Sequence, residues 1–279
     1  MDFVYYYFML LAVAATKTSA IANKETSSTT LVTALYDIGR GSWKLSPRSY
    51  GQYLEYFKRI LSTNENMVIF VDEKDMDFVK NYRKQLNLDN KTDIRTPNVN
   101  TLEYFDYLQY ITDILETDDF KENNKMLDKP WGFSPLYVAL VNNKISFLNT
   151  ATRANPFGSK SFFWIDASYG FGTDTPFTHE NWNPEELQTI SDKMIYAVSP
   201  DIKAYKILMN MMILHKREIP AAVNGGFFGG TVPAIAKYHQ LYRKQFREAL
   251  VENIVSNDEY FALSCINENP DVFYIVASS

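Results

Sequence analysis

Short apolar runs alternate with longer helical patterns along this chain of 279 residues, and this alternation restricts the fold more than any other feature. The runs expected to form strands are residues 31–36, 67–71, 92–96, 161–165, 194–198 and 272–276. The patterns expected to form helices are residues 50–61, 75–86, 102–115, 134–151 and 231–252, with a shorter one at 183–186. Strands that alternate with helices favour a mostly parallel sheet covered by helices on both faces. We therefore predict an α/β, Rossmann-like fold with a mixed, mostly parallel sheet.

Charged residues follow three of the expected strands. Asp37 and Arg40 come after the first strand, Asp72 after the second, and Asp166 directly after Ile165. In sheets of this kind, ligands bind beyond the carboxyl ends of the strands. A single aspartate at such a position is more simply explained as a helix cap or a turn residue. Three aspartates at equivalent strand ends, however, indicate a binding cleft.

Residues 223–231 hold four glycines around two phenylalanines. Each glycine costs backbone entropy in a regular element and adds no side chain to pack, so we expect a loop here and not a strand or a helix. Such a loop allows close backbone approach, and the helix that follows Thr231 offers free N–H groups at its start. Two interpretations remain open: a packing turn with Phe227 and Phe228 in the core, or a loop that touches a polar ligand.

Asp166 ends an apolar segment, and a carboxylate in that position can hold a divalent cation against phosphate groups. Mg²⁺ and Mn²⁺ sites commonly use two carboxylates, but Ser168 stands where the second would be expected, and Asp174 lies further along. The sequence therefore leaves open a Mn²⁺ or Mg²⁺ site with Asp166 as its first ligand.

Asp258 and Glu259 are adjacent acids at the expected start of another helix. The simpler interpretation is that they cap this helix and interact favourably with its dipole. If Glu259 instead faces the cleft, it can act as a base or as a carboxylate that stabilises a cationic transition state.

Composition and motif content argue against several classes of protein. A net charge of −5 and a pI near 5.3 disfavour nucleic acid as a partner, because phosphate binding needs a cationic surface. The sequence has no HExxH, GxSxG, CxxC, P-loop or GxGxxG motif, and His179, His215 and His239 share no metal-ligand spacing. Zinc, hydrolase-triad, P-loop and nicotinamide chemistry therefore have no support. Cys265 lies in an apolar run and is expected to be a buried, inert thiol.

The N-terminal segment differs in kind from the rest of the chain. Residues 3–15 are apolar, which is short for a membrane span of about 20 residues, and small residues follow that suit signal-peptidase cleavage. We expect residues 1–22 to be a signal peptide or signal anchor and residues 30–279 to form a single domain. The chain would then enter the secretory pathway, to be secreted or kept in the ER or Golgi lumen. It would touch a membrane only through this segment, if uncleaved, and the sequon at Asn90 could be glycosylated.

Several segments together resemble the HtrL/YibB family over residues 30–276. The matching segments are Tyr36-Asp37-Ile38-Gly39-Arg40-Gly41, Arg48-Ser49, 67–72, Ser134-Pro135-Leu136-Tyr137, Asn155-Pro156-Phe157, Phe163-Trp164-Ile165-Asp166-Ala167 and 224–230. The family looks like a glycosyltransferase of the GT-A type, so the resemblance implies a GT-A-like domain that uses a nucleotide-sugar donor.

A narrower resemblance concerns residues 225–232, which are similar to the acceptor loop of retaining galactosyl- and N-acetylgalactosaminyltransferases of the blood-group type. It implies that Glu259 is the catalytic carboxylate and that Asp258 contacts the acceptor or the donor sugar. Those enzymes carry an Asp-x-Asp metal motif, of which only Asp166 is kept here.

Together these resemblances assign roles within one cleft. The donor would be bound by Asp37, Arg40, Arg48, Asp72 and Asp166, and the acceptor glycan by Gly225, Gly226, Phe227, Phe228 and Gly229. Two functions remain open: a glycosyltransferase, or a catalytically reduced protein that binds carbohydrate or nucleotide sugar on the same fold. Loss of the second acid at Ser168 would suit the second function.

Overall fold

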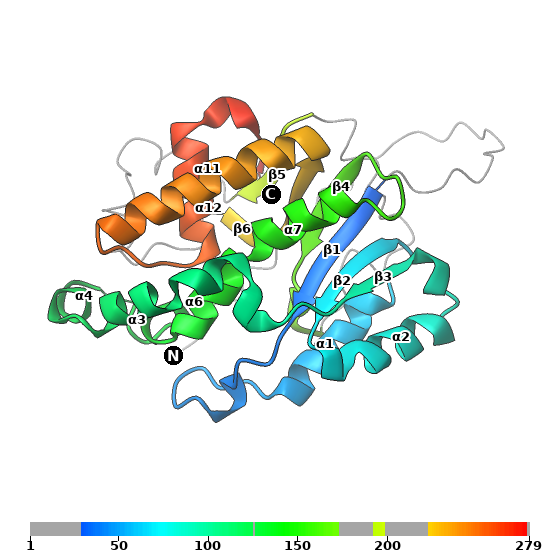
Figure 1. Ribbon diagram of the computed structural model, residues 1–279, viewed down its shortest axis with the longest axis horizontal. Coiled ribbons are helices and arrows are strands. Elements are labelled where there is room, and N and C mark those ends of the chain that lie inside the picture. The colour runs from blue at the N-terminus through cyan, green and yellow to red at the C-terminus, as the bar shows by residue number, and fades with distance from the viewer. Residues whose placement is uncertain (1–28, 125, 173–191, 199–222, 278–279) are drawn as a thin grey trace.

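One seven-stranded sheet organises the part of the chain that the structure describes. The computed structural model describes residues 29–124, 126–172, 192–198 and 223–277 (Figure 1). The strand order is β3-β2-β1-β4-β6-β5-β7. The strands are β1 (Thr29–Leu35), β2 (Asn66–Val71), β3 (Thr92–Arg95), β4 (Ser161–Ile165), β5 (Met194–Val198), β6 (Val223–Thr231) and β7 (Phe273–Ala277). The predictions for residues 1–22, Asp174, His179, residues 183–186 and His215 lie outside the described residues.

The sheet is mixed and mostly parallel, as predicted. β1 runs parallel to both β2 and β4, β2 to β3, and β5 to β7. Only the pairings of β6 with β4 and β5 are antiparallel among the described strands. The carboxyl ends of β1, β2 and β4 therefore meet at one edge of the sheet, which brings Asp37, Asp72 and Asp166 to the same side.

Helices cover both faces of the sheet (Figure 1). They are α1 (Tyr50–Leu61), α2 (Met76–Gln85), α3 (Leu108–Glu116), α4 (Asp118–Asn123), α5 (Pro130–Phe133), α6 (Pro135–Asn142), α7 (Lys144–Ala154), α11 (Val232–Val251) and α12 (Asp258–Glu268). Successive residues of a strand point to opposite faces. Leu31 and Phe163 thus pack with α1 on one face, and Val32 and Trp164 pack with α7 and α11 on the other. Apolar strands on both sides are what a doubly covered sheet requires.

The prediction of a loop at residues 223–231 is wrong, because this segment is the strand β6. Its two phenylalanines pack on opposite faces, Phe227 stacking on Phe163 and Phe228 on Tyr196. The glycines are required by close neighbours within the sheet. A Cβ atom at Gly229 would lie 2.5 Å from Cδ1 of Phe163, and one at Gly230 would lie 2.7 Å from the Lys193 carbonyl oxygen. Tight packing against β4 and against the segment before β5, and not loop geometry, thus explains Gly229 and Gly230.

Two of the predicted helices differ in detail from the structure. The segment 134–151 contains two helices, α6 and α7, which meet at Asn143. The segment 102–115 starts with a 3₁₀-helix, Glu103–Tyr107, before α3 begins at Leu108. The first difference matters for the site, because the break places Lys144 at the start of a new helix.

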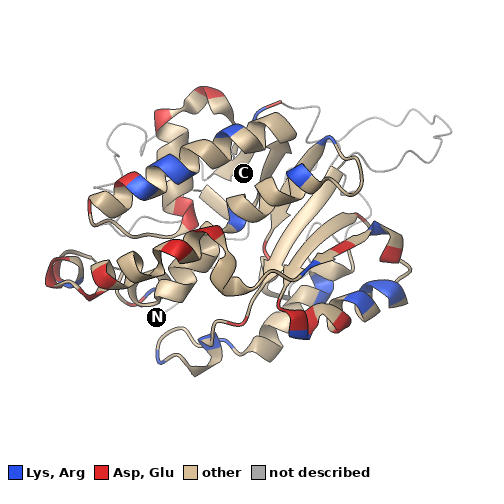
Figure 2. Cartoon of the chain, in the orientation of Figure 1, with Lys and Arg blue, Asp and Glu red and all other residues tan. Residues whose placement is uncertain are grey.

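The exposed helix faces carry charges of both signs (Figure 2). Lys58 pairs with Glu55 on α1, and Lys244 pairs with Glu248 on α11. Exposed pairs of this kind contribute little to stability. Within the described ranges, no helix has the length and apolarity needed to cross a membrane. Cys265 is buried, as predicted, and burial raises the pKa of its thiol.

Candidate functional site

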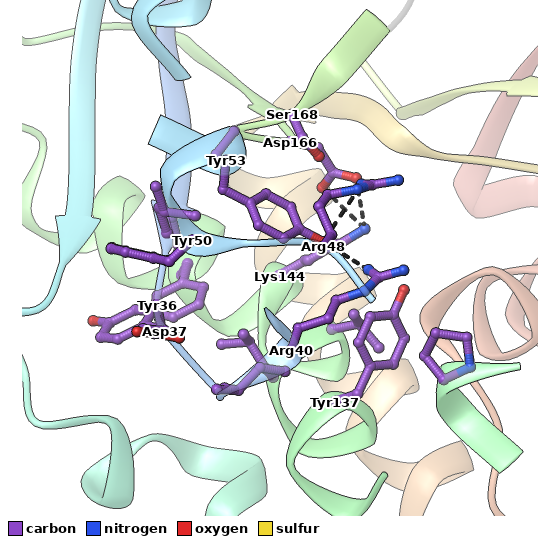
Figure 3. A pocket seen from close by; sticks show the side chains of 18 of the residues that line it. Tyr36, Asp37, Arg40, Arg48, Tyr50, Tyr53, Tyr137, Lys144, Asp166 and Ser168 are labelled. Atoms are coloured by element: carbon purple, nitrogen blue, oxygen red, sulfur yellow. Dashed lines mark hydrogen bonds and ion pairs between the residues drawn. The ribbon is translucent and has the colours of Figure 1, made fainter. Parts of the chain in front are cut away.

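A cavity of about 290 Å³ lies at the carboxyl ends of β1 and β4 (Figure 3). Its walls come from the segment after β1, from α1, from α5 to α7 and from the segment after β4. Among the predicted donor-binding residues, Asp37, Arg40, Arg48 and Asp166 line it. This is the position at which ligands bind in open α/β sheets.

Arg40 and Arg48 both reach the hydroxyl group of Tyr53. The distances from their Nη1 atoms to the Tyr53 oxygen are 2.6 Å and 3.4 Å. Arg40 also lies over the rings of Trp43 and Tyr137, and Arg48 lies over the ring of Phe171. Neither guanidinium forms an ion pair with a carboxylate of the described residues. Two positive charges therefore face this cavity without a negative partner there.

Asp37 and Asp72 have less to offer a ligand. Oδ1 of Asp37 accepts a hydrogen bond from the Gly39 N–H, and Oδ2 lies 3.5 Å from Lys74 Nζ, so this aspartate forms a local turn. Asp72 is not among the residues that line the cavity, and burial raises the pKa of its carboxyl group. The structure thus brings Asp72 to the predicted edge of the sheet but not into the cavity wall.

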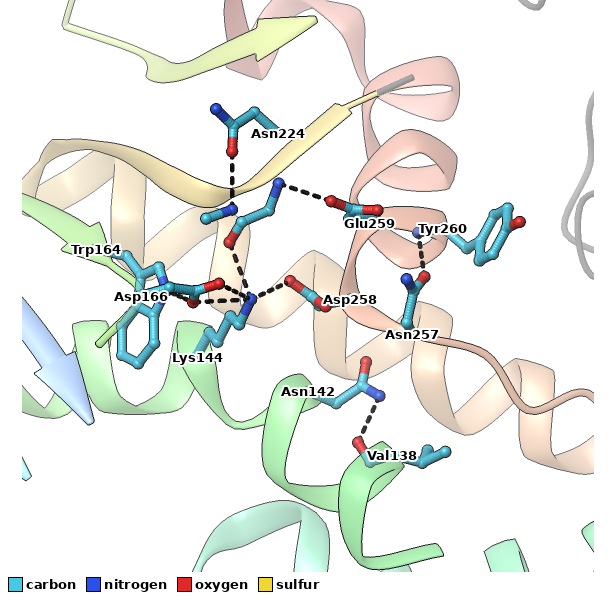
Figure 4. Close-up of polar contacts among 12 residues, drawn as sticks. Val138, Asn142, Lys144, Trp164, Asp166, Asn224, Asn257, Asp258, Glu259 and Tyr260 are labelled. Carbon is cyan, nitrogen blue, oxygen red and sulfur yellow. Dashed lines mark hydrogen bonds and ion pairs between the residues drawn. The ribbon is translucent and has the colours of Figure 1, made fainter. Parts of the chain in front are cut away.

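Lys144 joins the predicted residues into one buried cluster (Figure 4). Its Nζ atom lies 3.0 Å from Asp166 Oδ1 and 2.8 Å from Asp258 Oδ2. It also donates a hydrogen bond of 3.0 Å to the carbonyl oxygen of Gly225. The indole N–H of Trp164 donates to Asp166 Oδ1 at 2.7 Å. Residues that are far apart in the sequence therefore meet at one ammonium group.

The cluster shifts the pKa values of its members. Burial alone would lower the pKa of Lys144, but Asp166 and Asp258 outweigh burial and raise it, so that the ammonium stays charged. Burial raises the pKa of Asp258, although Lys144 opposes the shift. Burial and the charge of Asp258 raise the pKa of Glu259 to about 7. Glu259 can thus exchange a proton near neutral pH, which suits an acid–base or charge-stabilising role.

Gly225 lies in β6 and forms a hydrogen bond with the first turn of α12. Its N–H donates to Glu259 Oε1 at 3.3 Å, while its carbonyl accepts from Lys144. Asn224 Oδ1 accepts from the Gly226 N–H, and its amide nitrogen donates to the Tyr169 hydroxyl. Of the five residues predicted to bind the acceptor, only Gly225 and Gly226 are near the acidic cluster. Phe227, Phe228 and Gly229 pack within the sheet and its two cores, and their role toward an acceptor stays a prediction.

Replacing Gly225 by alanine should destabilise the cluster. A Cβ atom there would lie 2.5 Å from Asp258 Oδ2 and 2.8 Å from Glu259 Cγ, so the acidic side chains must move. We expect a loss of about 1–3 kcal/mol in the free energy of unfolding, measured by urea denaturation. Gly51→Ala on α1 is the control, because its Cβ would meet only Ser49 Oγ at 4.0 Å. A Gly225→Ala protein as stable as the control would contradict this packing.

Asp258 and Glu259 stand in the first turn of α12, whose N-cap is Asn257. The position at a helix start agrees with the capping interpretation, and both acids also contact the cluster, while a role of Glu259 toward a substrate stays a prediction. Neither is among the residues that line the cavity, but Asp258 forms an ion pair with Lys144, which does line it. Their charges therefore act on the cavity through its inner wall.

The arrangement around Asp166 does not suit a divalent cation. Such an ion needs several oxygen ligands directed at one point, and carboxylates are its usual ligands here. The point between Asp166 and Asp258 is instead occupied by the Lys144 ammonium group. Across the described ranges, no cluster of three or more Asp, Glu, His or Cys side chains is placed to hold a metal.

Lys144, Tyr53 and Tyr137 are functional candidates that the sequence reasoning missed. Tyr53 belongs to an expected helical pattern and Tyr137 to a segment that resembles the family, and neither pattern assigns a site role to these two residues. Lys144 did have a signal: Asn142-Asn143-Lys144 is a polar triplet inside an otherwise apolar helical stretch. Such a triplet marks either a helix break or a buried polar contact, and here it marks both.

Comparisons with solved structures give low scores. The chain is similar to apo mouse xyloside xylosyltransferase 1, with 11% identity and a TM-score of 0.44, over 88% of this chain and 84% of that one. It is also similar to a cytidylyltransferase from Leptospira borgpetersenii serovar Hardjo-bovis, with 10% identity and a TM-score of 0.35, over 90% and 76% of the two chains. Both TM-scores are below 0.5, so these similarities do not assign an activity.

Sequence comparison gives a clearer result. Protein HtrL of Escherichia coli strain K12 is 23% identical over 261 residues, which cover 88% of this chain and 87% of that protein. The family described as "Bacterial protein of unknown function (HtrL_YibB)" matches residues 27–279. The predicted resemblance is confirmed across the whole described region, and the chain belongs to the HtrL/YibB family.

Proposed function

We propose that this chain is a glycosyltransferase that moves a sugar from a nucleotide-sugar donor to a glycan acceptor. The observation that carries the proposal is the pair Arg40 and Arg48, which face the cavity without a carboxylate partner among the described residues. Guanidinium groups bind phosphate oxygens in pairs of parallel hydrogen bonds. A diphosphate at the carboxyl ends of β1 and β4 would satisfy both arginines.

The rest of the cavity suits the other parts of such a donor. The rings of Tyr50, Tyr53 and Tyr137 offer flat apolar surface to a base or a sugar. Lys144 and Asp166 stand at the inner wall, where the sugar would be nearest to Asp258 and Glu259. In the transfer, the bond between the anomeric carbon and the diphosphate breaks, and the electron pair leaves with the nucleoside diphosphate. The oxygen of the acceptor hydroxyl forms the new bond to the anomeric carbon, and its proton passes to the Glu259 carboxylate or to the leaving diphosphate.

Glu259 is the residue that we assign to the anomeric side of the donor sugar. Its raised pKa means that it is partly ionised near neutral pH, and the ionised form can stabilise a cationic anomeric carbon or take up a proton.

Nucleotide binding tests the proposal directly. UDP- and GDP-sugars are added singly to the full chain, with a CMP-sugar, which carries no diphosphate, as the comparison, and the thermal midpoint is followed; we expect the UDP- or the GDP-sugar to raise it. Replacing Arg40 or Arg48 by leucine should weaken binding of that nucleotide by about 10- to 100-fold, because each charged hydrogen bond contributes about 1.5–3 kcal/mol. Arg153→Leu is the matched control, since Arg153 is exposed on α7.

Each outcome has a distinct meaning. No stabilisation by any nucleotide sugar would overturn the proposal. Stabilisation without release of nucleoside diphosphate, over a panel of glycan acceptors, would favour the catalytically reduced binding protein. Equal losses for Arg153→Leu and the cavity variants would show that the cavity arginines have no special part in binding.

A further inference from the structure

Oxygen atoms of three residues surround the Lys144 ammonium group. It donates hydrogen bonds to Asp166 and to the Gly225 carbonyl oxygen and forms an ion pair with Asp258, with Nζ 2.8 to 3.0 Å from the nearest atom of each (Figure 4). The side chain is 11% exposed, and what remains exposed lines the cavity. The ammonium is thus a fixed positive charge in the wall of the proposed donor site.

This position is the one that a bridging metal ion would need. A divalent cation that joined Asp166 to a diphosphate would have to lie beside the Asp166 carboxylate, on the cavity side. Both oxygens of that carboxylate already face Lys144 Nζ, at 3.0 Å and 3.2 Å. Ser168, where a second acidic ligand would be expected, offers only a hydroxyl group. A metal would therefore meet a like charge and one incomplete ligand.

We propose that Lys144 supplies the fixed cation of this site, so that donor binding and transfer proceed without a divalent metal. The proposal rests on the proposed function, because it assumes a diphosphate in the cavity. Lys144, Arg40 and Arg48 would then surround that diphosphate with three positive charges. Preorganised charges of this kind stabilise the negative charge that develops on a leaving group.

The first test compares metal conditions. UDP, GDP and CDP are titrated into the full chain by calorimetry, once in EDTA and once in Mn²⁺. We expect the nucleotide that binds to have the same dissociation constant in both within about twofold, which corresponds to less than RT in free energy. Binding that requires Mn²⁺, or is tightened by it about tenfold or more, would overturn the proposal.

A direct metal titration keeps this inference separate from the proposed function. Mn²⁺ is added to the nucleotide-free protein and the free ion is followed by electron paramagnetic resonance. We expect no stoichiometric binding, whatever the nucleotide experiments show. Stoichiometric Mn²⁺ binding that Asp166→Asn abolishes would overturn the inference even if a nucleotide also binds. Failure of all three nucleotides in both conditions would instead overturn the proposed function.

Variants of Lys144 test the effect of its charge on the nucleotide. Lys144→Met should weaken nucleotide binding by about 10- to 100-fold in EDTA, since it removes a positive charge from the cavity wall beside the proposed diphosphate. Lys160→Met is the control, because Lys160 is an exposed lysine before the amino end of β4. Equal affinity in Lys144→Met and wild type would mean that Lys144 only holds the acids together.

Lys144→Met leaves the carboxylates of Asp166 and Asp258 without their shared cation and could unfold the chain. In that case the double variant Lys144→Met/Asp258→Asn is used, with Asp258→Asn alone as its reference. The double variant should bind the nucleotide about 10- to 100-fold more weakly than the reference. Equal affinities of the two proteins would overturn the proposed role of the Lys144 charge.

Discussion

Replacing Glu259 by glutamine is expected to reduce sugar transfer by about 10²- to 10⁴-fold, the range typical of a positioned acid or base. Glutamine has the same shape and keeps an oxygen for the Gly225 N–H, which Glu259 now accepts at 3.3 Å. What it removes is the negative charge. Nucleotide binding should remain within about twofold of wild type, because the arginines that we assign to the diphosphate are untouched. The measurement is the release of nucleoside diphosphate at saturating donor, beside calorimetry for binding.

The pH dependence of the same variant provides an independent check. Burial and the charge of Asp258 raise the pKa of Glu259 to about 7, while Lys144 and the Gly225 N–H oppose this shift and Asp166 adds to it. If the ionised form is the active one, the wild-type rate should rise with pH through about 7 and level off above it. The residual rate of Glu259→Gln should lack this step. A wild-type rate that falls over the same interval would mean that the protonated acid is active.

The stability of Glu259→Gln should move in the opposite direction to its activity. A carboxyl group with a raised pKa binds its proton more tightly in the folded state than in the unfolded state. Its contribution therefore falls as pH rises from 4.5, its ordinary value, to about 7. Glutamine carries no charge to bury, so the variant should melt at a higher temperature than wild type at pH 8 and show no such gain at pH 4. A lower melting temperature at pH 8 would contradict the raised pKa.

Glu252→Gln serves as the control for all three measurements. Glu252 is exposed at the end of α11, away from the Lys144 cluster. We expect no change in rate, pH profile or melting temperature from it. An equal loss of activity in Glu252→Gln would show that the effect of the Glu259 variant is not local.

The strands and most helices could be predicted because their local patterns agree with their environment. Residues 161–165 form β4 with the bounds that the apolar run gave, since a strand covered on both faces is apolar throughout. The strand-end rule then placed Asp166 at a cavity. Each of these inferences uses information that lies within a few residues of the chain.

β6 could not be predicted in the same way, because its glycines are required by close contacts with residues that are distant in sequence. Gly229 is required by β4 and Gly230 by the segment before β5. Rules based on the local sequence treat glycine as unfavourable in a strand, and they do not include packing against segments that are distant in sequence. The same reason explains why Lys144 was missed: its partners Asp166, Gly225 and Asp258 come from three other elements, and only the folded chain brings them together.

Replacing Arg83 by methionine is expected to cost about 3–5 kcal/mol in the free energy of unfolding, the largest stability effect that we anticipate. Arg83 is fully buried on α2, and all its donors are used. Nε donates to Thr92 Oγ1 at 2.8 Å. Its other hydrogen bonds go to the carbonyl oxygens of Leu61, Thr63, Glu65 and Lys91, at 2.7 to 3.1 Å. Methionine fills similar space but leaves these buried carbonyl groups without a donor.

Urea denaturation of the full chain measures this cost, with Lys84→Met as the control. Lys84 neighbours Arg83 on α2 but is exposed, so its replacement should change stability by no more than about 0.5 kcal/mol. Arg83→Lys should recover little, because one ammonium group cannot reach carbonyls from both α1 and the segment before β3. The four carbonyls lie near the end of α1 and the amino ends of β2 and β3. The Lys144 cluster lies at the opposite edge of the sheet, at the carboxyl end of β4. Nucleotide affinity below the melting temperature should therefore stay unchanged, and a loss of stability below about 1 kcal/mol would contradict the role of Arg83.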